Sequence, residues 1–336
     1  MRKQIMALMD SEEPYAVRFM EHMNRKKAAP FVVQAFTDGE KLREYADTHR
    51  IEVLLIAERD LETVGVCRAG QVIVLADRNT GSGSSYPAVS KYQASSAIMR
   101  EVMEIYSRKE QEDGGEASDP VLKPPMKIIG IFSPVGRCLK TSYALALGQC
   151  LARKKATLYF NFEAASGLRY LLGEEWKRDL SDIIYYIRRG DRNITARLIP
   201  LIREIGALGY VPPSPFPAEI YQVTADEWNR LFASLRRDSS YEALILDLGD
   251  LPLLNPDILE ECDLIYMPVR DDEIAKAKVA AFQDMLRELD EESAQRIRPI
   301  RLAAGSGAAA GKNWAEQLPY GALGRYAEEC IEADHL

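Results

Sequence analysis

The chain has 336 residues, longer than one typical domain, so two domains are expected. Its formal net charge of −8 argues against direct, sequence-independent DNA binding, which needs many Lys and Arg residues to neutralise phosphates. No uninterrupted apolar run approaches membrane-spanning length, and the five scattered cysteines lack C-x-x-C spacing, so we expect a cytoplasmic protein with reduced thiols and no direct membrane insertion.

The N-terminal part, residues 1–106, alternates strand-like and helix-like segments. Alternation of this kind predicts a parallel α/β sheet with crossover helices. The predicted strands are Gln4–Met9, Phe31–Phe36, Ile51–Ala57 and Gln71–Leu75, and the predicted helices are Glu13–Arg25, Gly39–His49 and Ala94–Tyr106.

This order of segments resembles a response-regulator receiver domain, a flavodoxin-like fold. Asp10 follows the first strand, and Lys91 stands near the position of the receiver lysine. Ile56 and Ala57, however, occupy the place of the phosphoacceptor Asp, with Glu58 just beyond. The resemblance therefore implies an atypical receiver-like domain that serves as a surface for dimerisation or partner docking. The alternative is a flavodoxin-like domain unrelated to receivers, which leaves that role unchanged.

Residues 107–122 are polar, contain glycine and have almost no large apolar side chains, so we expect a flexible linker there. The second domain is predicted to span 123–336 as a doubly wound α/β sheet. Its predicted strands are Lys127–Phe132, Ala156–Phe162, Ile205–Val211, Tyr241–Gly249, Asp263–Val269 and Ile300–Ala304. Its predicted helices, apart from the one that opens at Lys140, are Gly167–Gly173, Asp179–Arg189, Thr224–Arg236 and Asp272–Leu289.

The segment Met126–Gly148 combines a strand, a tight loop and a helix that opens with Lys140 and Thr141. This is the frame of a phosphate-binding P-loop, in which backbone N–H groups, the helix N-terminus and the Lys face the phosphates. Pro134 and Leu139 replace the two glycines of G-x-x-x-x-G-K-[ST]. We expect Leu139 to distort or narrow the loop, because glycine is used where a Cβ is excluded. The alternative is an ordinary strand-to-helix turn that contains Lys-Thr.

Two further strands carry polar residues at their ends. Asp247 ends an apolar strand in EALILDLGD, where P-loop proteins place an Asp beside Mg²⁺. The stretch LYFNFEAASGLRYLLG resembles the corresponding segment of MinD/ParA deviant-Walker ATPases, with Asn161 and Glu163 where that family has two Asp residues. Asn carries no charge and cannot act as a base. Val135 stands where the family has its signature Lys, a loss that would slow phosphoryl transfer by orders of magnitude.

The MinD/ParA resemblance implies ATP and Mg²⁺ as ligands. Lys140 would contact the β- and γ-phosphates, Ser142 would hold the α-phosphate, and Glu163 is the candidate for positioning water. Mg²⁺ would be held, directly or through water, by Thr141, Asp247 and Asn161. The full predicted nucleotide-binding set is Val135, Gly136, Arg137, Cys138, Leu139, Lys140, Thr141, Ser142, Pro268 and Arg270.

A receiver-like domain, a linker and a degenerate MinD-like domain in this order resemble the TadZ/CpaE family. The resemblance covers nearly the whole chain and includes the S-P-x-G loop at 133–142, the stretch GALGYVPPSPFPAEIYQVTADEW and the segment WAEQLPYG at Trp314–Gly321. It implies an atypical ATP-binding homodimer that localises and helps to assemble Tad (Flp) pilus machinery, with pilus and secretion assembly proteins as partners. Its address would be cytoplasmic, at a pole or at the inner face of the membrane through those partners.

Two other functions are compatible with the same residues. One is a cycling ParA/MinD-type ATPase that positions DNA or protein cargo, which the acidic charge balance disfavours. The other is a nucleotide-free pseudo-ATPase scaffold in which Leu139 blocks the pocket. The kept residues Lys140, Thr141 and Asp247 favour ATP binding with weak or absent hydrolysis.

Overall fold

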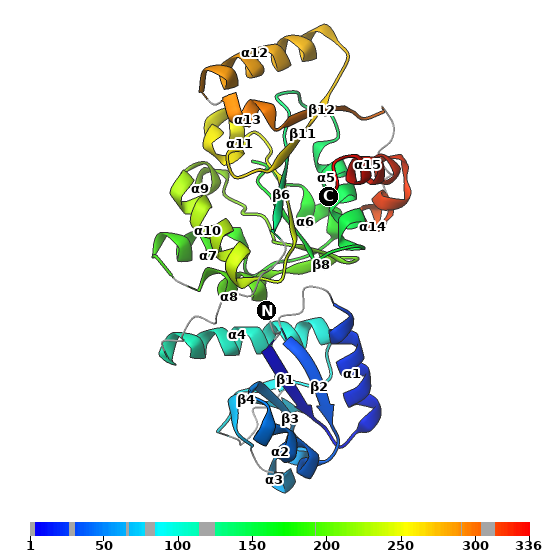
Figure 1. Cartoon of the computed structure of the whole chain (residues 1–336), viewed down its shortest axis with the longest axis vertical. Coiled ribbons are helices and arrows are strands. Elements are labelled where there is room, and N and C mark those ends of the chain that lie inside the picture. The colour runs from blue at the N-terminus through cyan, green and yellow to red at the C-terminus, as the bar shows by residue number, and fades with distance from the viewer. Residues whose placement is uncertain are drawn as a thin grey trace. The chain divides into compact units, whose positions relative to one another are not determined.

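The computed structural model divides the chain into two compact units, Met1–Lys123 and Pro124–Leu336 (Figure 1). The structure describes residues 4–26, 31–64, 67–77, 85–113, 125–191, 193–289, 291–303 and 313–336. Each unit has its own sheet and its own hydrophobic core, and each is described by itself below.

The described residues of the N-terminal unit form a five-stranded parallel sheet in the order β2-β1-β3-β4-β5. This is the strand order of flavodoxin-like doubly wound sheets. The four strands expected from the sequence are confirmed, whereas β5 was missed because three residues are too few to show alternation. The strands are β1 (Gln4–Met9), β2 (Phe31–Phe36), β3 (Ile51–Ala57), β4 (Ala69–Ala76) and β5 (Ala88–Ser90).

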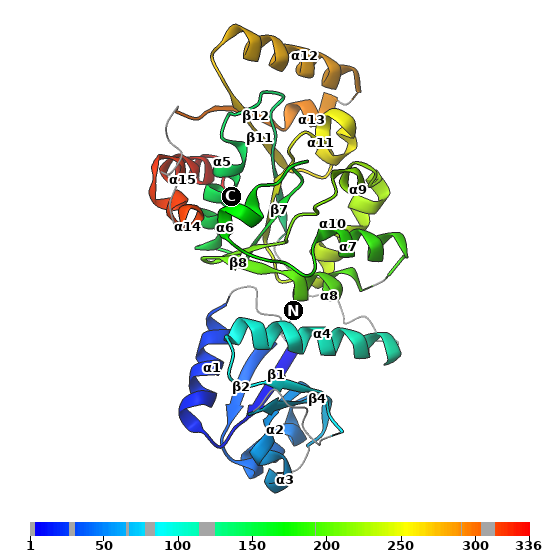
Figure 2. The ribbon, with the colours of Figure 1, turned by 180° about the vertical axis from the view of Figure 1, so that it is seen from behind.

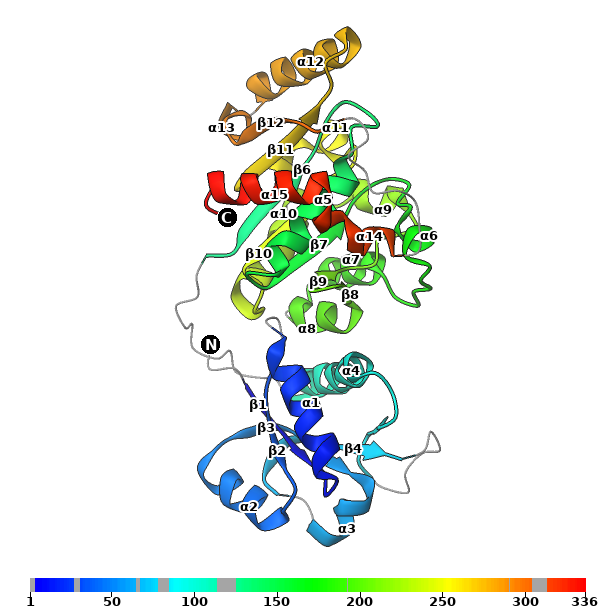
Figure 3. The same ribbon diagram turned by 90° about the vertical axis from the view of Figure 1, so that its right-hand side faces the viewer.

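Helices cover both faces of this sheet. Because successive side chains of a strand point to opposite faces, Ala7 and Met9 of β1 pack against Leu42 on one side, while Phe31 meets Tyr106 on the other. Figure 3 shows α1 and α4 on one face and α2 and α3 on the other. The helices are α1 (Glu13–Arg25), α2 (Gly39–Thr48), α3 (Leu61–Val64) and α4 (Ser95–Asp113).

Helix α4 is longer than the sequence predicted. It continues past Tyr106 to Asp113, so the start of the expected linker at 107–122 is helical. Five of the seven residues in this stretch, SRKEQED, are Arg, Lys, Glu or Gln, which are good helix formers although they are polar, and helix propensity does not require an apolar face. The remainder of the expected linker lies outside the described residues.

The described residues of the C-terminal unit form a seven-stranded sheet in the order β12-β11-β6-β10-β7-β9-β8. All pairings are parallel except that of β8 with β9, an antiparallel hairpin where a single strand, Ile205–Val211, was predicted. The strands are β6 (Lys127–Ile131), β7 (Thr157–Asn161), β8 (Arg203–Ile205), β9 (Leu208–Tyr210), β10 (Ala243–Asp247), β11 (Leu264–Val269) and β12 (Ile297–Arg301).

Two helical layers sandwich this sheet (Figure 2). One layer contains α5 (Lys140–Ala152), α14 (Trp314–Gln317) and α15 (Ala322–Ala333), and the opposite layer contains α7 (Leu180–Arg188), α10 (Ala225–Asp238) and α12 (Glu273–Leu289). None of the helices in the described part of the chain is long and apolar enough to cross a membrane. The shorter helices are α6 (Leu168–Leu172), α8 (Ile194–Leu198), α9 (Pro217–Tyr221), α11 (Leu251–Leu254) and α13 (Glu291–Gln295), and the 3₁₀ turns are η1 (Glu58–Asp60), η2 (Ile199–Leu201), η3 (Pro256–Leu259) and η4 (Leu318–Tyr320).

Helices α5 and α15 pack directly on each other. Their shared cluster contains Leu147 of α5 and Ile331 of α15, both nearly inaccessible to solvent. The ring of Tyr143 lies 6.1 Å from that of Tyr326, measured between centroids. Helix α15 is therefore part of the core that supports α5, although the sequence reading assigned no helix to this segment.

Candidate functional site

A strand, a loop and a helix meet at the centre of the C-terminal sheet. Strand β6 ends at Ile131, the loop follows, and α5 begins at Lys140. Strand β6 lies between β10 and β11, so the loop emerges at the carboxyl edge of the parallel strands. In open α/β sheets this edge is where ligands bind.

The loop is closed by its own polar groups. The hydroxyl oxygen of Ser133 accepts a hydrogen bond from the backbone N–H of Val135 at 3.1 Å. The thiol of Cys138 donates to the carbonyl oxygen of Val135 at 3.1 Å. All three residues are buried, so Val135 and Cys138 face the protein and not the solvent.

Two non-glycine residues of the loop have left-handed backbone conformations. Arg137 has φ 55° and Leu139 has φ 66°. A non-glycine residue in this region costs roughly 1–2 kcal/mol, so the loop is strained at Leu139, where the P-loop pattern has glycine. The side chain of Leu139 is half-buried and packs against the hydrophobic cluster that includes α5. The distortion expected at Leu139 therefore lies in its backbone, while its side chain belongs to the core.

The first turn of α5 combines free backbone donors with one cation. Leu139 is the N-cap and makes no side-chain capping bond, so the first amides of the helix have no side-chain acceptor there. The ammonium group of Lys140 donates to the carbonyl oxygen of Ser133 at 3.2 Å and lies 3.7 Å from Oδ1 of Asp250. Thr141 and Ser142 follow, both half-buried. Such a helix start favours an anion.

Asp247 ends β10 directly beside this turn. Its register partners are Ile131 of β6 and Asn161 of β7, and its side chain is inaccessible to solvent. Oδ2 accepts hydrogen bonds from the Tyr159 hydroxyl and from Nδ2 of Asn161, each at 3.1 Å. Oδ1 has no hydrogen-bond partner among the described residues.

The carboxyl group of Asp247 is held in an unfavourable environment for its charge. Burial, and then the nearby carboxylate of Glu163, raise the pKa of Asp247 to about 7. The side chains of Thr141, Tyr159 and Lys140 act in the opposite direction and lower it. A buried acid with one oxygen unpartnered is a position where a cation would be stabilised.

Asn161 bridges Asp247 to the segment that follows β7. Besides its bond to Asp247, its Nδ2 donates to the Tyr159 hydroxyl at 2.8 Å. Its Oδ1 accepts from the backbone N–H of Glu163 at 3.1 Å. The structure thus brings Asn161, Glu163 and Asp247 together, and both ends of the Asn161 amide are engaged by protein groups.

The turn after β10 passes against the backbone of Glu163. Gly249 has φ 53°, and a Cβ added there would lie 2.7 Å from the Cα of Glu163. A side chain at this position would displace the Glu163 backbone. Gly249 therefore permits the close approach of the segments that carry Asp247 and Glu163.

Pro268 and Arg270, the two members of the predicted nucleotide-binding set that lie outside the loop and α5, have different surroundings. Pro268 is buried within β11, with Ile300 of β12 as its register partner. Arg270 follows the strand, is exposed and pairs with Asp272 at 3.0 Å. The backbone N–H of Phe132 bonds to the carbonyl oxygen of Tyr266, which ties β11 to the start of the loop at 3.1 Å. Of the two, Arg270 has the side chain that is accessible to a ligand.

Sequence reasoning missed four residues that shape this site. Ser133 acts through both its hydroxyl and its carbonyl oxygen, Gly249 acts through its backbone, and Asp250 faces the ammonium of Lys140. Tyr159 could have been found, because it lies two positions before Asn161 on the same strand and so shares its face. The backbone roles have no signal in the sequence.

No protein-family model matches the chain, and no curated protein matches it by sequence. Among solved structures, the chain is similar to a ParA family ATPase from Chlorobium tepidum (17% identity, 58% of this chain and 81% of the other, TM-score 0.45). It is also similar to a cobyrinic acid a,c-diamide synthase from Mycobacterium smegmatis with bound ATP analogue and magnesium (15% identity, 52% of this chain and 70% of the other, TM-score 0.41). A third similar structure is a plasmid partition protein from Borrelia burgdorferi bound to AMPPNP (14% identity, 62% of this chain and 99% of the other, TM-score 0.41).

Proposed function

We propose that this chain is an atypical MinD/ParA-like protein that binds ATP with Mg²⁺ and hydrolyses it slowly or not at all. The observation that carries the proposal is the placement of Asp247, buried and with Oδ1 unpartnered among the described residues, beside a helix start that carries Lys140 and Thr141. A cation is favoured beside the carboxylate of Asp247, and a phosphate is favoured at the start of α5. Mg²⁺ and the phosphates of one nucleotide would thus bind next to each other.

The residues present fit a magnesium–nucleotide complex. Mg²⁺ binds through one or two carboxylates and through phosphate oxygens, and it does not need a cage of protein ligands. No group of three or more His, Cys, Asp or Glu side chains in the described part of the chain is arranged to hold a metal alone. Asp247 and Thr141 would hold the ion together with the phosphates, and the ion would neutralise phosphate charge.

The phosphates would be held by the amides of the loop 136–140 and by Lys140. Its ammonium now donates to the Ser133 carbonyl oxygen within its own loop, a bond that it can exchange for a phosphate oxygen. Ser142, in the same helical turn, would hold the α-phosphate. Arg270, exposed after β11, would line the base beside the buried ring of Pro268.

Slow hydrolysis follows from what stands in place of charged groups. Val135 is apolar and buried where the family has a cation, so it cannot stabilise charge in the transition state. Asn161 is neutral, and its amide is engaged with Asp247 and Glu163. Glu163 is the remaining candidate for orienting water. Binding and hydrolysis are therefore separable in this site.

The cellular role rests on the order of motifs in the chain. A unit with flavodoxin-like strand order, followed by this candidate site, supports a TadZ/CpaE-like homodimer that localises and helps to assemble Tad (Flp) pilus machinery. In this proposal the N-terminal unit docks partner proteins. Light scattering of the purified full chain with and without ATP and Mg²⁺ tests dimerisation; a monomer under both conditions would contradict it.

The nucleotide proposal is tested by titrating the full chain with a fluorescent ATP analogue in the presence of Mg²⁺. Wild-type protein should bind, and Lys140→Ala should weaken binding by about tenfold or more, since charge-assisted hydrogen bonds contribute roughly 1.5–3 kcal/mol. Lys154→Ala is the matched control, because Lys154 is an exposed lysine just beyond the C-terminal end of α5.

Three results distinguish the alternatives. Absence of binding at millimolar ATP, with no rise in melting temperature, would favour a nucleotide-free scaffold. Steady-state phosphate release stimulated by DNA or by a partner would favour a cycling ATPase. Binding that is unchanged by Lys140→Ala would place the nucleotide elsewhere on the chain.

A further inference from the structure

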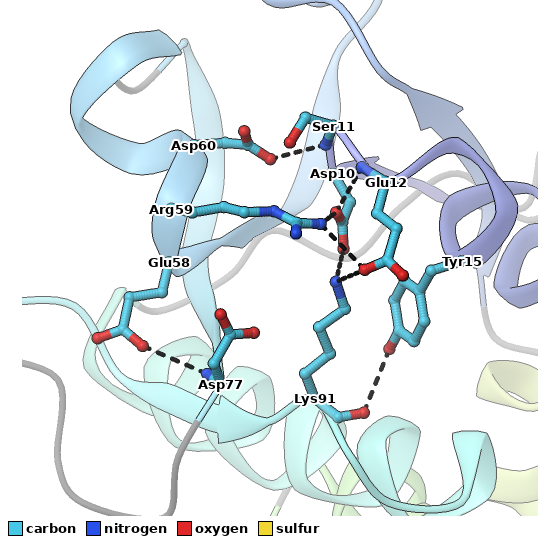
Figure 4. A network of polar contacts seen from close by, with 9 residues as sticks. All are labelled: Asp10, Ser11, Glu12, Tyr15, Glu58, Arg59, Asp60, Asp77 and Lys91. Atoms are coloured by element: carbon cyan, nitrogen blue, oxygen red, sulfur yellow. Dashed lines mark hydrogen bonds and ion pairs between the residues drawn. The ribbon is translucent and has the colours of Figure 1, made fainter.

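A second cluster of charged side chains lies at the carboxyl end of β1 in the N-terminal unit (Figure 4). At its centre is Asp10, whose side chain is inaccessible to solvent. The ammonium of Lys91 lies 2.5 Å from Oδ2 of Asp10, and the guanidinium of Arg59 donates to Oδ1. The backbone N–H of Glu12 also donates to Oδ1, at 2.9 Å. Two cations therefore flank one buried carboxylate.

Glu12 contributes a second carboxylate to the same two cations. Its Oε2 accepts from Arg59 at 3.1 Å and from Lys91 at 3.0 Å. Lys91 is fully buried and also lies over the ring of Tyr15, 4.4 Å from the ring centroid. Two carboxylates and two cations give these four side chains a formal charge of zero. The cluster is neutral without any added ion.

The turn after β3 positions the guanidinium. Strand β3 ends at Ala57, and Arg59 lies in the 3₁₀ turn η1. The turn is fixed at Asp60, whose carboxylate accepts from the backbone N–H of Ser11 at 2.8 Å. Figure 4 shows Glu58 pointing away from the cluster toward Asp77. Its carboxylate accepts a hydrogen bond from the backbone N–H of Asp77 at 3.3 Å. The group that the turn after β3 contributes to the cluster is therefore a cation and not an acid.

The charges in the cluster depend on one another. Burial alone raises the pKa of Asp10, but hydrogen bonds from Lys91, the Glu12 backbone and Arg59 outweigh it, so that the pKa is lowered. An ionised carboxylate at this depth needs a cation beside it. Paired carboxylates at the carboxyl edge of a parallel sheet are also the groups that hold divalent metal ions. In this unit the guanidinium of Arg59 already donates hydrogen bonds to the carboxylates of both Asp10 and Glu12.

We propose that Arg59 is a built-in cation that takes the place of a divalent metal ion between Asp10 and Glu12, and so holds the turn after β3 in one state whatever the metal concentration. A divalent ion beside two existing positive charges would meet strong repulsion. Removing the guanidinium leaves two carboxylates with Lys91 alone, a net charge of −1, together with the space that the guanidinium filled.

The proposal is tested by calorimetric titration of the full chain with MnCl₂ in the absence of nucleotide. Arg59→Ala should bind Mn²⁺ at least about tenfold more tightly than wild type, as expected for removing one unit charge beside a divalent ion at an effective dielectric constant of about 20. Adding Asp10→Asn to Arg59→Ala should abolish the gained binding. This assigns the new binding to the cluster and not to the site at Asp247.

Arg50→Ala is the matched control, because Arg50 is an exposed arginine of the same unit that pairs with Glu52. It should leave Mn²⁺ binding at the wild-type level. If circular dichroism shows that the alanine variant is unfolded, the test is repeated with Arg59→Gln, which keeps a polar side chain of similar length. The proposal is overturned if wild type already binds Mn²⁺ in an Asp10-dependent way, or if a folded Arg59 variant gains no binding.

Discussion

Nδ2 of Asn161 lies 3.1 Å from Oδ2 of Asp247, so an uncharged amide donates a hydrogen bond to the buried acid of the neighbouring strand. In the MinD/ParA-like pattern the position of Asn161 carries a second carboxylate. Two adjacent buried carboxylates need a cation or a shared proton between them, whereas this pair does not. The site can therefore stay folded without metal ion.

Asn161→Asp tests this relationship. The second carboxylate would face Asp247 and lose the hydrogen bond, so the unit should lose about 3 kcal/mol of stability without Mg²⁺ at pH 8, where Asp247 is mainly ionised. Millimolar MgCl₂ should restore part of that loss. Thermal melts with and without MgCl₂ measure both effects. Asn229→Asp, an exposed change beside Glu261, should have a small and Mg²⁺-independent effect; equal behaviour of the two variants would contradict the prediction.

Asp247 should make stability depend on pH. Its pKa in the folded chain is raised to about 7 from an ordinary value of 3.8, so the folded state holds the proton more tightly than the unfolded state. Its contribution therefore favours folding at low pH and is lost as the pH rises from about 4 to about 7. Burial is the main cause, with Glu163 adding to it and Lys140 opposing it.

Asp247→Asn removes this titration. At pH 8 without nucleotide the variant should be more stable than wild type by about 1–4 kcal/mol, since one pKa unit corresponds to about 1.4 kcal/mol. At pH 4 the difference between the two proteins should be much smaller. Denaturant unfolding at both pH values measures the difference. Asp10, whose pKa is lowered, contributes in the opposite sense, with stability present above about pH 4 and lost below it.

Arg137→Gly should stabilise the C-terminal unit. Arg137 is exposed and left-handed at φ 55°, so glycine relieves roughly 1–2 kcal/mol of strain, against roughly 0.5–1 kcal/mol of added chain entropy. The expected net gain is about 0.5–1 kcal/mol. Arg230→Gly, in the exposed interior of α10, should instead destabilise by about 1 kcal/mol. A loss of stability in Arg137→Gly would show that the arginine side chain itself supports the loop.

Gly249→Ala should be more costly than an ordinary glycine substitution in a left-handed turn. The added Cβ meets the Glu163 backbone at 2.7 Å, whereas the same change at Gly173, with φ 64°, meets nothing within 4 Å. We expect a loss of about 2–4 kcal/mol for Gly249→Ala and about 1 kcal/mol for Gly173→Ala. Chemical denaturation compares them. Similar losses would mean that the approach of the two segments is not constrained by sterics.

The sequence predicted the elements that have a strong local signal. Both α1, with a proline near its start, and α10, with the Thr224–Glu227 capping box, lie where they were expected. Short or polar elements were missed. Strand β5 has three residues, and α14 and α15 follow a stretch without clear periodicity. The end of α4 was placed too early because its final turns have no apolar face to detect.

The site was predictable where it depends on residue type at the end of a strand. Asp247 was expected from its spacing after the loop and Asn161 from the resemblance of its stretch to MinD/ParA sequences, and the strand register places them opposite each other. The strain at Leu139 was anticipated from the missing glycine, but the packing of its side chain against the core cluster was not. The role of Arg59 was hidden because its partners Asp10 and Glu12 are distant in sequence.

Leu139 packs against the hydrophobic cluster that α5 and α15 share, so the loop rests on the same core as the C-terminal helix. Within this cluster the ring of Tyr143 in α5 lies against the ring of Tyr326 in α15. A substitution in the part of this cluster that α15 contributes would therefore reach the loop through packing alone, without any change to the loop's own polar groups.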